Sequence, residues 1–197
     1  MMQHIDVSSV LRQAVACDLY SNLVTRPTGA AVRAQIQALL RAAPVRERPL
    51  AILDFSHVRM IDFSCADEVI AKLVLPYCEG DEPEADAYFL FRGVSEAHWD
   101  AIEAVLERHA LALVIEEDGV VRVAGVVEEE EQRVWLALQR LAGGDAPDVA
   151  RALADEGRPH SAHEVERILE RLHRRRLVMR LDDGYYLPVG AGIGSRG

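Results

Sequence analysis

A row of basic side chains near the C-terminus has the spacing of one helix face. Arg167, Arg171 and Arg174 are four and three residues apart, so a helix brings them to the same side. Such a row can contact the phosphates or guanine edges of DNA. Three glutamates are interleaved with it, a pattern that is also typical of a solvated, salt-bridged helix face. The candidate DNA-binding residues are His163, Arg167, Arg171, Arg174, Arg175 and Arg180.

Other patterns that could support chemistry lack the partners that they need. A zinc site could draw on His160, His163 and His173, but no cysteine is near them, and structural zinc needs about four thiolate or imidazole ligands. Glycines at positions 190, 192 and 194 follow no expected strand, unlike a nucleotide-binding loop. No G-x-S-x-G or H-E-x-x-H motif is present. We therefore expect no catalytic residue, no metal and no cofactor, and a protein that is not an enzyme.

Ser64 stands two residues after Asp62, where a helix is expected to begin. The apolar positions that follow, from Ala66 to Tyr77, have the spacing of an amphipathic stripe. A serine at this place can act as the N-cap, with Asp67 favourable in the first turn. A phosphate group at a helix N-terminus is also stabilised. Ser64 therefore has two compatible interpretations, a helix cap and a phosphoacceptor.

Residues 1–127 alternate between strand and helix patterns. Strands are expected at Ile5 and Val7, at 50–55 and at 88–91, and a hairpin is expected around Asp118-Gly119. Helices are expected after Thr25-Arg26-Pro27, after Ser64 and after Ser95. This order predicts an α/β domain with a mixed sheet and covering helices.

An acidic run, Glu128 to Glu131, separates this part from a second unit. The run fits the first turn of a helix, where negative charge complements the dipole, so we expect nearly rigid coupling of the two units. Three helices follow, with stops at Gly143-Gly144 and Gly157 and a capping box at Ser161-x-x-Glu164. A hairpin around Asp182-Asp183-Gly184 completes an order that resembles winged helix-turn-helix modules. We assign residues 128–190 to this domain and residues 191–197 to a flexible tail.

The segment from Leu53 to Glu68 resembles STAS domains, the fold shared by sulfate transporters and anti-sigma-factor antagonists. The motif is a strand ending in Asp54, a Val-x-x-Ile-Asp segment ending in Asp62, and Ser64 at the start of a helix. Thr25-Arg26 and Asp67-Glu68 are similar to the small STAS-like variant, and the resemblance covers roughly residues 5–125. It implies a protein partner at Ser64, Asp62 and Asp54, such as a serine kinase (ATPase) or a sigma-pathway protein. In phosphorylatable members the position of Ser64 receives the phosphate.

Charge and hydropathy narrow the class of protein. The net charge is −10, and residues 1–127 carry −8 of it. Net negative charge repels phosphate at long range, which does not fit a general nucleic-acid binder. No apolar run approaches the roughly 18 residues of a membrane helix, and no secretory signal begins the chain, so we expect a cytoplasmic protein without membrane contact.

The function expected from these patterns is regulation without catalysis. The STAS-like domain would receive a signal from a protein partner, and the winged helix would bind DNA and control transcription. A homodimer would fit paired half-sites. The alternative is a protein–protein adaptor of a partner-switching pathway that binds no DNA. An enzyme accessory subunit or a small-ligand sensor is a third class.

Overall fold

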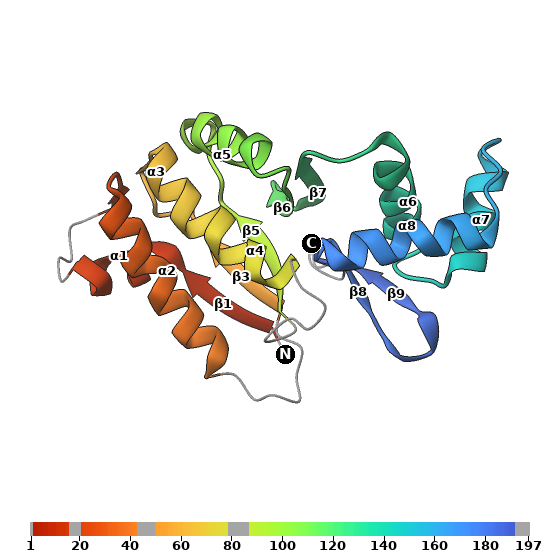
Figure 1. Cartoon of the computed structure of the whole chain (residues 1–197), viewed down its shortest axis with the longest axis horizontal. Helices are drawn as coiled ribbons and strands as arrows, with labels where there is room; N and C mark the ends of the chain where they lie inside the picture. Colours follow the sequence, from red (N-terminus) through yellow and green to blue (C-terminus); the bar gives the residue numbers. More distant parts are fainter. Residues whose placement is uncertain (1, 16–20, 43–49, 79–86, 192–197) are drawn as a thin grey trace.

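The computed structural model describes residues 2–15, 21–42, 50–78 and 87–191. They form an α/β unit with a five-stranded mixed sheet, followed by three helices and a β-hairpin, and the two parts lie side by side as two lobes (Figure 1). The sheet has the order β1-β3-β5-β6-β7, with the first four strands parallel and β7 antiparallel. Its strands are β1 (Met2–Asp6), β3 (Leu50–Asp54), β5 (Tyr88–Arg92), β6 (Ala112–Glu117) and β7 (Val120–Gly125). The expected α/β class is confirmed.

Helices cover one face of this sheet. They are α1 (Val7–Val15), α2 (Arg26–Arg41), α3 (Phe63–Ala66), the π-helical η1 (Asp67–Ala71), α4 (Lys72–Cys78) and α5 (Glu96–Arg108). Alternate strand residues such as Ile5, Leu53 and Phe91 point into the core below them. Two short strands, β2 (Asn22–Leu23) and β4 (Met60–Ile61), pair in parallel beside the main sheet.

The start of the chain differs from the prediction. Ile5 does lie in a strand, but Val7 begins α1 and does not continue the strand. The Asp6 carboxylate accepts a hydrogen bond from the Ser8 backbone N–H at 2.9 Å, which satisfies a donor of the first helical turn. Val7, Val10 and Leu11 then have helical spacing and are buried.

The C-terminal unit follows the predicted caps closely. It consists of α6 (Glu129–Arg140), α7 (Ala146–Asp155), α8 (Ala162–Arg174), β8 (Val178–Arg180), the 3₁₀ turn η2 (Asp182–Gly184) and β9 (Tyr186–Pro188). Glu128 is the N-cap of α6, so the acidic run does begin a helix. Ser161 caps α8 together with Glu164, as the capping box predicted. Gly144 and Tyr186 exchange two backbone hydrogen bonds, which tie the α6–α7 connection to the hairpin.

A second hydrophobic cluster joins the two units. It combines residues of the other sheet face, such as Ile52, Tyr88 and Leu90, with Trp135 and Leu172 of the C-terminal helices. The Gln139 side chain donates to the Val121 carbonyl at 2.7 Å across the same boundary. The two units therefore share one hydrophobic core. The predicted tail lies almost wholly outside the described residues, and in the part that is described no helix is long and apolar enough to span a bilayer.

Candidate functional site

The start of α3 is organised by Asp62. Its carboxylate accepts hydrogen bonds from the Cys65 backbone N–H at 2.8 Å and from the Ser64 hydroxyl at 2.9 Å. Asp62 has the extended backbone of an N-cap, whereas Ser64 already lies inside the first helical turn. The prediction that Ser64 is the cap is therefore wrong. The structure brings Ser64 and Asp62 into direct contact.

Asp54 belongs to a different turn. At the end of β3 its carboxylate accepts the Ser56 backbone N–H at 2.8 Å, which shapes the loop leading to β4. In the sheet register Asp54 is the neighbour of Asp6 and Arg92. Asp54 and Asp62 thus each hold their own turn and share no hydrogen-bond partner among the described contacts.

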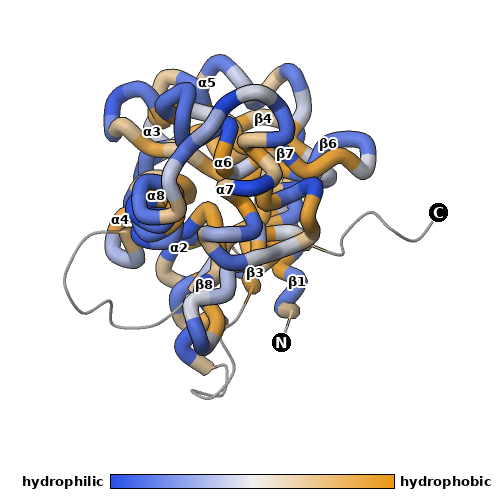
Figure 2. Tube along the Cα trace, turned by 90° about the vertical axis from the view of Figure 1, so that its right-hand side faces the viewer, coloured by the Kyte–Doolittle hydropathy of each residue, from blue (hydrophilic) through white to orange (hydrophobic). Residues whose placement is uncertain are grey.

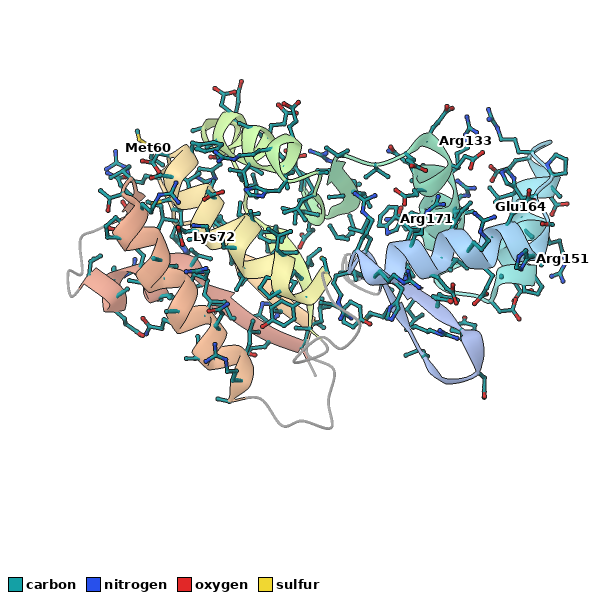
Figure 3. The ribbon with its side chains drawn as sticks, in the orientation of Figure 1. Met60, Lys72, Arg133, Arg151, Glu164 and Arg171 are labelled. Carbon is teal, nitrogen blue, oxygen red and sulfur yellow. The ribbon has the colours of Figure 1, made fainter. Side chains whose placement is uncertain are left out.

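An exposed apolar and basic surface adjoins Ser64. Met60 is 53 % exposed at the edge of β4, far from the C-terminal unit (Figure 3). The Arg108 guanidinium lies over the Phe63 ring, 5.6 Å from its centroid, as in a cation–π contact. We call Met60, Phe63, Ser64 and Arg108 the Ser64 surface. Sequence reasoning missed Met60, Phe63 and Arg108, because their proximity depends on how α5 packs beside α3.

Behind this surface lies a buried ionic cluster. Asp67 and Glu68 are only 5 % and 3 % exposed although both are acidic. Arg26 contacts both carboxylates at 3.1 Å, and Arg33 lies 3.2 Å from Glu68. Lys72, the only lysine of the chain, also pairs with both, and His109 lies 2.8 Å from Asp67. The η1 ion cluster consists of Arg26, Arg33, Asp67, Glu68, Lys72 and His109; Lys72, the first residue of α4, is labelled in Figure 3.

Close helix packing makes the cluster possible. A Cβ atom at Gly29 of α2 would lie 3.0 Å from the Cα of Cys65 and 3.0 Å from the Cβ of Glu68. Glycine therefore lets α2 approach α3 and η1 closely enough for its arginines to reach the carboxylates. The sequence signal for this cluster was the acidic pair Asp67-Glu68 inside an apolar stripe.

The pKa of Asp67 is lowered by the η1 ion cluster. Burial alone would raise it, but hydrogen bonds from His109 and Arg26 and the charge of Lys72 outweigh that effect. A lowered pKa in the folded state means that Asp67 stabilises the fold above its unfolded pKa of about 3.9. This stabilisation is lost as the pH falls through the folded pKa.

The substitution Asp67→Asn is expected to make the free energy of unfolding depend less on pH in the acidic range. Urea unfolding between about pH 3 and pH 6 should show a smaller loss of stability in the variant than in the wild type, because the asparagine cannot titrate. Asp100→Asn, at an exposed position of α5, is the control and should keep the wild-type slope. Parallel profiles for the wild type and Asp67→Asn would contradict the assignment.

Cys65 is a buried packing residue. Its Sγ donates to the Thr25 carbonyl at 2.9 Å, and burial, with the nearby Asp62 carboxylate, raises the pKa of the thiol to about 11. Iodoacetamide at about pH 8 should therefore leave Cys65 unmodified in the folded chain and modify it after denaturation, as peptide mass spectrometry can show. Equal labelling in both states would contradict this environment.

The basic residues near the C-terminus divide into two groups. His163, Arg167 and Arg174 are exposed on α8, which presents mainly hydrophilic residues in Figure 2. Arg171 instead pairs with Glu128 at 3.2 Å and Glu131 at 3.3 Å, and Arg175 pairs with Glu131 and the Val126 carbonyl. Arg180 is exposed, with its guanidinium 5.9 Å from the Tyr186 ring centroid. Two of the six candidate DNA-binding side chains, Arg171 and Arg175, therefore form ion pairs with glutamates at the start of α6.

A surface hollow of about 280 Å³ lies beside the first half of α8. Arg167, Arg171 and His160 line it together with Glu130 and Glu164. Its lining is therefore of mixed charge. Among the described residues no group of three His, Cys, Asp or Glu side chains converges as a metal site requires.

Comparison of the chain with models of protein families, with curated proteins and with solved structures finds no match.

Proposed function

We propose that the chain is a non-enzymatic regulatory protein whose STAS-like α/β unit docks a protein partner and whose winged-helix unit binds DNA. The observation that carries the DNA proposal is the exposed basic set on α8 and the adjoining hairpin: His163, Arg167, Arg174 and Arg180. A helix with exposed arginines next to a β-hairpin can place the helix in a groove of DNA and the hairpin on the sugar–phosphate backbone.

The local topology supports a winged-helix unit. Three helices precede the hairpin, and the Gly144–Tyr186 bridge adds a third short strand position beside it. α8 begins at a capping box and keeps its apolar side, from Val165 to Leu172, buried. Its basic residues therefore have to face outward.

The Ser64 surface supports partner docking by the α/β unit. It combines an exposed Met60, a partly exposed Phe63 with the Arg108 guanidinium over its ring, and the next residue, Ser64, whose hydroxyl donates a hydrogen bond to Asp62. Such a surface suits a protein partner with an apolar side chain and acidic neighbours. A serine kinase of a partner-switching pathway would be one partner of this kind.

The test is a gel shift of the full chain with genomic DNA fragments at low and moderate salt. Binding at low salt that weakens at moderate salt supports the proposal. Absence of binding by the folded chain at low salt would refute it. The full chain is the correct sample, because the C-terminal unit shares its core with the sheet.

The adaptor function remains the second candidate, and one observation favours it. Glu128 and Glu131 neutralise Arg171 and Arg175, and the hollow beside α8 has a mixed-charge lining that suits a peptide as well as a phosphate. A specific protein complex that is unaffected by Arg167→Ala and Arg174→Ala, together with no DNA binding, would support the adaptor. Homodimerisation on paired half-sites is part of the DNA proposal and is testable by light scattering.

A further inference from the structure

One helical rod connects the Ser64 surface with the C-terminal unit. α3, η1 and α4 follow each other without a break from Phe63 to Cys78, a length of about 24 Å. Asp62 and Ser64 lie at its first turn, and Tyr77 lies in its last turn. In Figure 1 the end of α4 points toward the C-terminal end of α8.

Arg176 holds the far end of this rod. It lies two residues after the last residue of α8, and its Nε donates to the Tyr77 carbonyl at 2.6 Å. The guanidinium also lies 5.3 Å from the Tyr88 ring centroid, and the Tyr88 hydroxyl is 3.3 Å from Nδ1 of His173 in α8. A cation at the C-terminal end of a helix is electrostatically favoured. Arg176 is only 6 % exposed and has a φ of +61°, a conformation that costs of order 1 kcal/mol or more for a residue with a side chain.

The middle of the rod is a π-helical segment. Asp67–Ala71 has the wider i→i+5 hydrogen-bond pattern of a π-helix, and such segments are frequent at functional positions. Conversion to a regular α-helix would rotate the residues beyond the segment by about 100° relative to those before it, because an α-helix has 3.6 residues per turn. The π-helical arrangement seen here and a regular α-helix would therefore be two discrete registers of the rod.

The η1 ion cluster surrounds the π-helical segment. Arg26, Arg33 and His109 come from α2 and from the end of α5, and they hold the two carboxylates of η1 from outside the rod. Arg26 is the most exposed of these cations, at 51 %, and it contacts both carboxylates. Ser64 precedes Asp67 and Glu68 by three and four residues, so a helix places it on the same side of the rod.

We infer that the rod from Phe63 to Cys78 is a register switch, in which negative charge at Ser64 weakens the η1 ion cluster and moves the Tyr77 carbonyl relative to Arg176. A phosphate on Ser64, or an acidic side chain of a partner docked there, competes with Asp67 and Glu68 for Arg26. The π register then loses its support, and the contact between α4 and α8 changes. This inference rests on the proposed function only for the partner or kinase that would supply the negative charge. The connection from Ser64 to Arg176 lies within the chain itself.

Hydrogen–deuterium exchange of the full chain without DNA tests the switch. Ser64→Glu adds one negative charge at the second residue of α3. The matched control, Ala97→Glu, adds the same charge at the second residue of α5, at an exposed position. Ser64→Glu should accelerate amide exchange about tenfold both in residues 67–77 and in residues 172–178, while α7 keeps its wild-type rates and Ala97→Glu changes neither range. No acceleration, or acceleration confined to residues 67–77, would overturn the inference.

Two further variants separate the steps. Arg176→Gly removes the guanidinium at a φ that suits glycine, so Ser64→Glu in that background should accelerate exchange in 67–77 but no longer in 172–178. An unchanged response in 172–178 would refute the role of Arg176.

Arg26→Gln removes the cation that Asp67 and Glu68 share and should reproduce the effect of Ser64→Glu. This variant keeps the test valid if Ser64→Glu unfolds the chain. A failure of DNA binding would leave all these exchange results unaffected, so the two proposals fail separately.

Discussion

Replacing Glu68 with alanine is expected to lower the free energy of unfolding by about 3 kcal/mol. Glu68 is almost fully buried and is held by Arg26, Arg33 and Lys72, so its removal leaves three cations facing a single remaining carboxylate, Asp67. Breaking a buried pair costs roughly 3–5 kcal/mol in general. We expect the lower end, because Arg26 and Lys72 are partly exposed and can turn toward water.

Urea denaturation at neutral pH measures this loss. Glu103→Ala, at an exposed position of α5, is the matched control and should change the stability by less than about 0.5 kcal/mol. A loss below about 1 kcal/mol for Glu68→Ala would mean that the η1 ion cluster behaves like an exposed salt bridge. The register switch would then lose its energetic basis.

Reversing two exposed arginines of α8 should have the largest effect on DNA binding. In the variant Arg167→Glu/Arg174→Glu, two phosphate-attracting charges become repulsive, and we expect the affinity at low salt to fall by about a hundredfold or more. Fluorescence anisotropy with a labelled duplex measures this change. The helix itself should persist, since neither residue belongs to its buried side.

A control with the same charge change is available in the same unit. Arg133→Glu/Arg151→Glu alters the net charge equally, but these side chains belong to α6 and α7 and not to α8 (Figure 3). We expect it to weaken binding by no more than about tenfold, through the long-range field alone. Equal losses in the two double variants would show that α8 has no special role.

Local sequence signals predicted the helix starts well. Thr25 before Pro27, Asp145 before Pro147 and the Ser161–Glu164 capping box each begin a helix as expected. The Asp118-Gly119 turn also joins β6 to β7, because both residues adopt the positive φ that such a hairpin needs. These features depend on residues within a few positions of each other, so a single sequence contains the information.

The parts that failed or were missed depend on distant contacts. α1 was missed because its polar half resembled a loop, and the π segment was missed because its register is supported by side chains from α2 and α5. The pairing of Arg171 with Glu128 joins residues 43 positions apart, and the hydrogen bond from Arg176 to Tyr77 joins residues 99 positions apart. Periodicity shows which side of a helix is polar, but it does not show which charge from elsewhere will neutralise it.

The salt dependence of DNA binding by the full chain tests the central proposal most directly. The exposed arginines Arg167, Arg174 and Arg180 would each displace about one counterion, so log K plotted against log salt concentration should be linear with a slope of about −3 per protomer. Reversal of Arg167 and Arg174 should reduce the magnitude of that slope by about two. A slope near zero, or no binding at low salt by a chain that circular dichroism shows to be folded, would contradict a DNA-binding regulator.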